Sequence, residues 1–272
     1  MSAHLPRWAA LNEPEAKSQV AQDSQPKARP ERPDDIQGSL AAVTLLRKLP
    51  AEAIQRLDQL CVWRAANPGD QILSRDSHSS DVFFVVKGRV RIVNYSASGR
   101  EVAFATAEAG DYFGELSAID GHPRSANVLA LDECRLAVMP PQVFRDVVRS
   151  DAEIALMVME KLTAIVRSCD DRIMDLATLS AYQRVYLELL KLRKPDPVRP
   201  NSWLIYPLPT QAQIAALAST TRETVARVLS QLQSDGVTER KSKTLYIRQL
   251  DRLQKLAERA QAAVERSGAD GH

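Results

Sequence analysis

The chain has 272 residues, of which 44% are hydrophobic and 26% charged, and its formal net charge is +2. This length predicts about two domains, and the composition suffices for ordinary hydrophobic cores. No apolar run is long enough to cross a membrane and the chain does not begin with a signal-peptide pattern, so we expect a cytoplasmic protein. The cysteines are too few and too widely separated for a disulfide framework or an iron–sulfur site, and we expect Cys61, Cys134 and Cys169 to be reduced and buried.

The first segment is rich in proline and charge and poor in apolar residues. Residues 1–38 hold five of the fifteen prolines. Such a segment cannot bury enough apolar surface to offset the entropy of ordering it, so we predict a disordered tail. Residues 39–60 then carry apolar side chains at helical spacing, which predicts helix.

Short apolar runs separated by glycines make up the next segment. Six of the ten glycines lie between residues 69 and 121. Short strands separated by turns are typical of an antiparallel roll or barrel. The predicted strands cover residues 82–86, 90–95, 102–105, 126–131 and 134–139.

A polar island interrupts the predicted roll. Gly114 permits close approach of the backbone, Glu115 can hold a ribose hydroxyl, and Arg124 with the adjacent hydroxyl of Ser125 can bind a phosphate. Together these residues predict a nucleotide site. The alternative is a simple ion pair between Glu115 and Arg124 in a loop. The candidate ligand-binding residues of the island are Gly114, Glu115, Leu116, Ser117, Arg124 and Ser125.

A long helix is predicted over residues 151–180. Its apolar residues recur mainly three or four positions apart, which favours a coiled-coil seam and a homodimer. Arg172 occupies a seam position between Cys169 and Leu176, so the register is imperfect. The alternative is a helix packed only against its own domain.

A helix-turn-helix is predicted at about residues 210–229. Apolar residues fall at helical spacings on both sides of a short turn. Thr210 with Gln213 and Thr220 with Glu223 each fit the capping box, in which a hydroxyl and an amide or carboxylate three residues later satisfy the free amides of a helix start. Both helix starts are therefore predicted independently.

Three charged side chains lie at the start of the second of these helices. Arg222 and Arg227 can bond to guanine O6 and N7, and Glu223 can accept a hydrogen bond from cytosine N4. Glu223 and Arg227 are four residues apart and share a helix face. The alternative is a solvent-exposed ion pair, which stabilises a helix by only about 0.2–0.5 kcal/mol. The coincidence of turn, caps and charged face predicts sequence-specific DNA binding.

Basic residues follow the predicted recognition helix. Arg240, Lys241 and Lys243 precede an alternating run that ends at Arg248, which predicts a two-stranded wing. A local positive excess is what phosphate contacts require. The alternative is a solvated hairpin without a role in binding.

These motifs together resemble one known superfamily. A glycine-punctuated roll carries Gly-Glu-Leu-Ser at 114–117 and Pro-Arg-Ser-Ala at 123–126, and Arg-Glu-Thr-Val-Ala-Arg follows at 222–227. This order resembles the cyclic-AMP receptor protein and fumarate-nitrate regulator superfamily over roughly residues 40–250. The resemblance implies an α+β fold. Its expected parts are a disordered tail (1–38), a β jelly-roll cyclic-nucleotide-binding domain (39–150), a dimerisation helix (151–180), a winged helix-turn-helix domain (181–251) and a helical or disordered tail (252–272).

The resemblance also implies what each ligand residue does. Glu115 would bind the ribose 2′-hydroxyl, Gly114 would admit the nucleotide, and Arg124 with Ser125 would hold the cyclic phosphate. The effector would be cyclic AMP, with cyclic GMP as the alternative, and no metal or iron–sulfur cluster is expected.

For DNA, the resemblance implies a palindromic site with half-sites like TGTGA. Arg222, Glu223 and Arg227 would read its bases, while Thr210 and Thr221 would contact phosphates. The expected partners are double-stranded DNA, a second copy of the chain and RNA polymerase.

The chain departs from the superfamily's pattern on the long helix. Where the cyclic-AMP receptors present adjacent threonine and serine to the purine, this sequence places Cys169 and Asp170, or Ser168 if the alignment shifts by one residue. An aspartate can accept from the adenine amino group or from guanine N1 and N2. Ser180 occupies the hinge position that is usually aspartate, which leaves the capping of the next helix open.

Other kinds of protein fit the sequence less well. The oxygen-sensor type needs clustered N-terminal cysteines, and residues 1–40 contain none. A haem sensor has only isolated histidines available as ligands. A regulator gated by a cyclic dinucleotide, or by no ligand, stays an alternative. We expect no enzyme, since no nucleophile, phosphate-loop or metal motif is present, and a nucleoid-type DNA binder does not suit the modest net charge.

Overall fold

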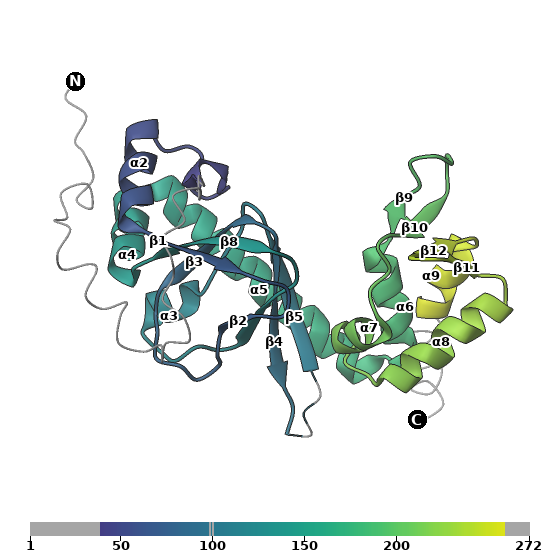
Figure 1. Cartoon of the computed structure of the whole chain (residues 1–272). Coiled ribbons are helices and arrows are strands. Elements are labelled where there is room, and N and C mark those ends of the chain that lie inside the picture. Colours follow the sequence, from purple (N-terminus) through teal and green to yellow (C-terminus); the bar gives the residue numbers. More distant parts are fainter. Residues whose placement is uncertain (1–38, 98, 100, 259–272) are drawn as a thin grey trace, which may run out of the picture. The chain divides into compact units, whose positions relative to one another are not determined.

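The computed structural model describes residues 39–258 except 98 and 100, so the predicted N-terminal tail and the last fourteen residues, 259–272, lie outside the described part. The described residues divide into two compact units. The first comprises 39–94 and 104–164, and the second comprises 95–103 and 165–258. Figure 1 shows strands dominating the first unit and helices the second.

Two four-stranded antiparallel sheets form the roll. Glycine turns separate the strands, as the sequence predicts. One sheet has the order β1 (Val62–Ala66), β8 (Cys134–Met139), β3 (Val82–Lys87), β6 (Tyr112–Phe113). The other has the order β2 (Gln71–Leu73), β7 (Asn127–Ala130), β4 (Arg89–Tyr95), β5 (Glu101–Glu108).

Strand β3 is buried on both faces, which explains its continuous apolar run. Successive side chains of a strand point to opposite faces. Val82 and Phe84 therefore join one core cluster, while Phe83 and Val85 join the other. Phe83 also stacks on Phe113, with ring centroids 5.1 Å apart. The paired strands β3 and β6 thereby fix the chain just before the polar island.

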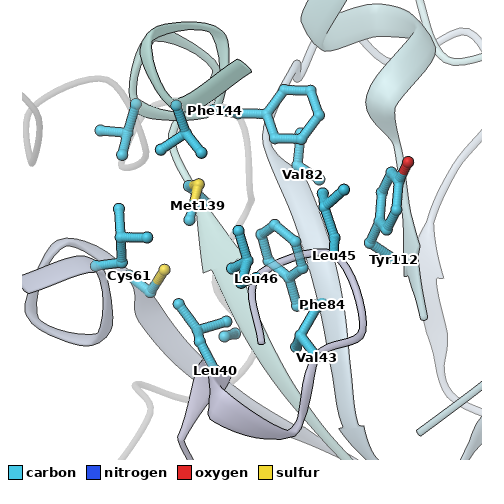
Figure 2. Packing of buried hydrophobic residues seen from close by; sticks show 14 of the residues in the cluster. Leu40, Val43, Leu45, Leu46, Cys61, Val82, Phe84, Tyr112, Met139 and Phe144 are labelled. Atoms are coloured by element: carbon cyan, nitrogen blue, oxygen red, sulfur yellow. The ribbon is translucent and has the colours of Figure 1, made fainter. Parts of the chain in front are cut away.

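Helices complete the first of these cores (Figure 2). The helical periodicity predicted over 39–60 is interrupted, because Pro50 has no amide hydrogen and starts a new helix as its N-cap. Phe144 and Tyr112 both belong to this core, with ring centroids 6.3 Å apart. The helices of this unit are η2 (Leu40–Ala42), α2 (Ala51–Leu60), α3 (Glu115–Asp120), α4 (Pro141–Ser150) and the first part of α5 (Ala152–Thr178).

The second unit is a small helical domain with a four-stranded sheet in the order β11, β12, β10, β9. Its core gathers Leu189, Ile214, Val225, Leu232 and Leu245, among others. After α5 its elements are α6 (Ala181–Leu192), β9 (Lys194–Pro195), β10 (Trp203–Ile205), α7 (Gln211–Leu217), α8 (Arg222–Ser234), β11 (Thr238–Lys241), β12 (Thr244–Ile247) and α9 (Leu250–Glu258).

Ser180 begins helix α6 with a complete capping box. Its hydroxyl accepts from the amide of Gln183, and the Gln183 side chain accepts from the Ser180 amide. Gln183 is buried and its side-chain Nε2 donates to the carbonyl of Ala257 in α9. Serine therefore performs the capping that the departure from aspartate left open.

The α+β fold predicted from the sequence is confirmed, with a β-rich domain, a long helix and a C-terminal helix-turn-helix. Among the residues that the structure describes, no helix is long and apolar enough to span a bilayer.

Candidate functional site

The polar island forms a tight turn at the end of β6. Gly114 has φ +87° and precedes α3 as its N-cap. A Cβ at this position would lie 2.7 Å from Nη1 of Arg124 and 2.9 Å from the carbonyl oxygen of Asp81. The backbone conformation and the surrounding atoms therefore both require glycine.

Arg124 is buried against this turn with only 3% of its surface exposed. Its Nη1 donates to the carbonyl of Gly114 at 2.9 Å, its Nη2 to the carbonyl of Asp81 at 2.7 Å, and its Nε to the hydroxyl of Ser79 at 3.1 Å. Burial lowers the pKa of this guanidinium, and the nearby Asp81 opposes that effect. Since a guanidinium has five N–H groups, two are left over after these contacts with described residues.

Glu115 is the second buried charge of the island, 5% exposed. Its Oε2 has no hydrogen-bond partner among the described residues and lies 3.6 Å from Nζ of Lys161 on helix α5. The plain Glu115–Arg124 ion pair, our alternative from sequence, is wrong, because Arg124 donates to Ser79 and two carbonyls and the ion-pair partner of Glu115 is Lys161. Sequence reasoning missed Lys161, since a lysine after Glu160 on a helix carries no distinguishing pattern.

The other residues of the island lie around this pair of charges. Ser117 is buried and Leu116 is exposed, both on α3. Ser125 is exposed, and its carbonyl accepts from the Asn94 side chain at 3.0 Å. The buried carboxylate oxygen of Glu115 can accept a hydrogen bond from a ligand hydroxyl, and the remaining N–H groups of Arg124 can bind a ligand phosphate. Gly114 lets the backbone of the turn come close to both groups.

Cys169 and Asp170 lie on the part of α5 that belongs to the second unit, and both are exposed. The expectation that all three cysteines are buried is therefore wrong for Cys169, although Cys61 and Cys134 are buried. Burial raises the pKa of the Cys61 thiol well above its usual range. A purine-facing role for Cys169 and Asp170 stays a prediction.

The exposed side of α5 carries an apolar row. Val166 and Ile173 are 59% and 62% exposed, and Leu176 is also largely exposed. Arg172, which the heptad pattern placed in this row, instead donates to the hydroxyl of Ser219 at 2.6 Å. Arg184 donates to the carbonyl of Ser219 at 3.2 Å. The turn of the helix-turn-helix is thus held by two arginines.

Helices α7 and α8 form the predicted helix-turn-helix. The capping box of Thr210 and Gln213 is present at the start of α7. The predicted box of Thr220 and Glu223 is wrong: α8 is capped by Thr221, whose hydroxyl accepts from the amide of Thr224 at 3.2 Å. Thr220 is buried in the turn, and its amide donates to the carbonyl of Ala215.

The proposed base-reading residues are all solvent-exposed on the first two turns of α8. Arg222, Glu223 and Arg227 lie opposite the buried face that holds Val225 and Val228. Hydrogen bonds from its own backbone amide and from the hydroxyl of Thr221 lower the pKa of Glu223. An ionised carboxylate is the form that accepts from cytosine N4. The phosphate candidates Thr210 and Thr221 are exposed at the starts of α7 and α8.

Strands β11 and β12 form the wing, and part of its positive charge is neutralised. Glu239 lies 2.8 Å from Nζ of Lys241 and also pairs with Arg248, whose Nε is 2.9 Å away. Hydrogen bonds from Lys241 and Arg248 lower the pKa of Glu239. Arg240 and Lys243 are exposed beside this cluster. Across the described ranges, no group of three potential metal ligands is gathered.

Two family models match consecutive parts of the chain. The cyclic nucleotide-binding domain matches residues 63–151, and the Crp-like helix-turn-helix domain matches residues 183–256. The chain belongs to the cyclic-AMP receptor protein and fumarate-nitrate regulator family, whose members are DNA-binding transcription regulators. The resemblance inferred from the motifs is thereby confirmed.

The alignments with two relatives cover most of the length of each relative. The chain is 29% identical over 202 residues to the cAMP-activated global transcriptional regulator Vfr of Pseudomonas aeruginosa, covering 71% of this chain and 94% of Vfr. It is 28% identical over 189 residues to the cyclic AMP receptor protein of Thermus thermophilus, covering 70% of this chain and 85% of the relative.

Solved structures show the same fold. The c-di-GMP responsive global regulator CLP of Xanthomonas campestris aligns with a TM-score of 0.62 at 22% identity, covering 73% of this chain and 99% of CLP. A CooA mutant from Carboxydothermus hydrogenoformans aligns with a TM-score of 0.66 at 21% identity, covering 79% and 96%.

Proposed function

We propose that this transcription regulator is gated by a cyclic nucleotide and acts as a homodimer on palindromic DNA with TGTGA-like half-sites. The observation that carries the proposal is the cradle of Gly114, Glu115 and Arg124. It offers one unsatisfied buried acceptor and N–H groups of a buried cation within one turn. The relatives activated by cyclic AMP support that nucleotide as the effector.

In this proposal each residue of the cradle has a defined task. Glu115 accepts from the ribose 2′-hydroxyl, and the remaining N–H groups of Arg124 bind the cyclic phosphate beside Ser125. Gly114 keeps the backbone close to the ligand. Cys169 and Asp170 face the purine, where the carboxylate of Asp170 selects between adenine and guanine donors.

Gating is a shift between two populations of the dimer. The ligand stabilises the state in which α5 pairs with its partner through the exposed apolar row and extends towards residue 180. The paired α8 helices then meet half-sites one helical turn apart. Arg222, Glu223 and Arg227 read the bases, while Thr210 and Thr221 position the domain on phosphates.

A regulator of this kind acts in the cytoplasm, through contacts with RNA polymerase, and has no catalytic reaction of its own. Cyclic GMP is the second candidate effector, because Asp170 can accept from guanine N1 and N2 as well as from the adenine amino group.

Isothermal titration with cyclic AMP, cyclic GMP and cyclic di-GMP tests the effector directly. We expect saturable heat with a cyclic mononucleotide. Heat only with cyclic di-GMP would change the ligand class, and specific DNA binding without heat from any of the three would refute gating by these nucleotides.

The phosphate role of Arg124 needs a variant chosen from its contacts. Arg124→Leu should abolish ligand-stimulated DNA binding, but it also strands the carbonyls of Gly114 and Asp81, so we expect it to lower stability as well. Arg124→Lys keeps the positive charge but loses the planar guanidinium with its several N–H donors. It should weaken ligand binding with a smaller loss of stability than Arg124→Leu. Arg64→Lys, which loses a contact with the Ile72 carbonyl in the same unit, is the matched control. Unchanged stimulation in both Arg124 variants would refute the role.

A further inference from the structure

Lys161 joins helix α5 to Glu115 of the polar island by one contact and to Tyr112 of the preceding strand β6 by two. Its ammonium lies 3.6 Å from Oε2 of Glu115 and 3.4 Å from the ring centroid of Tyr112. It also donates a hydrogen bond to the carbonyl oxygen of Tyr112, two residues before Gly114. All of these residues lie within the first unit, so one side chain ties the long helix to the strand and turn that form the cradle.

The ion pair is incomplete as it stands. Glu115 and Lys161 are separated by more than hydrogen-bond distance, and Oε2 of Glu115 has no hydrogen-bond donor among the described residues. A buried carboxylate oxygen without a donor is costly, and a donor that reaches it is favoured. Desolvation lowers the pKa of Lys161, while the carboxylates of Glu115 and Asp111 raise it. The ammonium is therefore held at this place by the same carboxylate that a ligand hydroxyl would engage.

We infer that Lys161 is the positioning residue through which α5 responds to a ligand at Glu115. A ribose hydroxyl that donates to Oε2 takes over the carboxylate from the ammonium. The ammonium of Lys161 then moves away from Glu115 and closer to the carbonyl and ring of Tyr112. This movement displaces helix α5, which carries Lys161. This inference rests on the proposed function and adds a residue that the ligand itself does not have to touch.

Lys161 lies on the same helix as the exposed apolar residues that we propose form the dimer contact. Exposed apolar side chains of α5 lie on both sides of Lys161, with Leu156 and Met159 before it and Ile165 and Val166 after it. A displacement of a stiff helix at residue 161 is carried along its length, because each turn is hydrogen-bonded to the next. The charge at Glu115 and the dimer face are thus connected by one continuous element.

The test measures coupling, which a merely structural role would leave unchanged. Affinity for a palindromic DNA duplex is measured with and without saturating cyclic AMP for the wild type, Lys161→Met and Lys161→Arg. The coupling ratio is the DNA affinity with cyclic AMP divided by the DNA affinity without it. For the wild type we expect a coupling ratio of about 5–150, which is typical of allosteric coupling. It should fall below roughly 2-fold in Lys161→Met, with cyclic AMP still bound, and be largely restored in Lys161→Arg.

Lys48→Met is the matched control. It removes another ion pair of α5, between Lys48 and Glu153, which is solvent-exposed and outside the cradle. Its ratio should equal that of the wild type. A wild-type ratio in Lys161→Met, or an equal loss in Lys48→Met, would overturn the inference while leaving the proposed function intact. A wild type that binds no cyclic nucleotide would instead overturn the proposed function itself.

A second measurement does not depend on the variants folding. The 2′-deoxy analogue of cyclic AMP lacks the hydroxyl that engages Glu115. It should bind the wild type yet raise DNA affinity by less than roughly 2-fold, like the natural ligand on Lys161→Met. Full stimulation by the deoxy analogue would also overturn the inference.

Discussion

Gly114 and Arg124 are held together in the turn that we propose binds the effector. The guanidinium donates to the Gly114 carbonyl at 2.9 Å, and the same Nη1 atom would lie 2.7 Å from any Cβ at residue 114. The residue expected to admit the nucleotide therefore also fixes the residue expected to bind its phosphate.

Gly114→Ala should damage both stability and ligand binding. The left-handed backbone costs a non-glycine residue about 1–2 kcal/mol. Displacing Arg124 leaves buried carbonyls without donors, at about 1–3 kcal/mol more. We expect a total loss of roughly 3 kcal/mol in the free energy of unfolding, measured by urea denaturation, with at least tenfold weaker cyclic AMP binding.

Gly69→Ala is the control for this variant, because Gly69 has φ +92° and no atom within 4 Å of an added Cβ. It should lose only the backbone part of the stability and bind ligand normally. Equal effects of the two substitutions on ligand affinity would show that contact with Arg124 does not matter.

Ser180→Ala should destabilise the second unit. It removes the hydroxyl that accepts from the Gln183 amide, and loss of such a cap costs about 1 kcal/mol. Ser180→Asp keeps an acceptor at the same place and should retain stability. Urea denaturation of both variants decides the matter, and a fully stable Ser180→Ala protein would show that the capping box contributes nothing.

Glu239→Gln should strengthen binding to any DNA sequence. The substitution removes the carboxylate that engages Lys241 and Arg248, leaving both cations available for phosphates. The slope of log affinity against log salt concentration should steepen by roughly 1–2 units, since each phosphate contact contributes about 0.9. A gain confined to TGTGA-like sites would contradict this account of the wing.

The same carboxylate makes the wing sensitive to acid. Its pKa is lower in the folded protein than the ordinary value of 4.5. A depressed carboxyl pKa stabilises the folded state above the ordinary pKa, and this contribution disappears as pH falls below 4.5 through the folded value. Glu239→Gln should lack that part of the acid dependence, which denaturation at pH 3–7 would reveal.

Arg227→Ala should relax specificity at one guanine. A bidentate arginine discriminates by about 1–3 kcal/mol, so affinity should fall on the specific site and little on non-specific DNA. Lys243→Ala in the wing should instead weaken all sequences similarly. Equal losses for Arg227→Ala on every sequence would assign it to a phosphate.

The sequence predicts most of the fold because local signals coincide with it. Glycine turns, the apolar run of β3 and the box of Thr210 with Gln213 each specify local geometry directly. The start of α8 predicted from the sequence is one residue too early, because Thr220 and Thr221 both offer a hydroxyl. Packing buries Thr220 in the turn and leaves the exposed Thr221 as the cap.

The missed features depend on residues far apart in the chain. Lys161 meets Glu115 across 46 positions, and Arg172 meets Ser219 across 47. Helical periodicity places Arg172 in an apolar row but cannot show the hydroxyl that it reaches. Such pairs follow from tertiary packing rather than from spacing.

In the proposed mechanism, ligand binding and DNA binding are coupled through one equilibrium. The most direct measurement is the reciprocal one: affinity for a TGTGA-like palindrome with and without cyclic AMP, and affinity for cyclic AMP with and without that palindrome. Linkage requires the two ratios to be equal, and we expect each to lie at about 5–150. Cyclic AMP that binds tightly while both ratios stay at one would contradict the account.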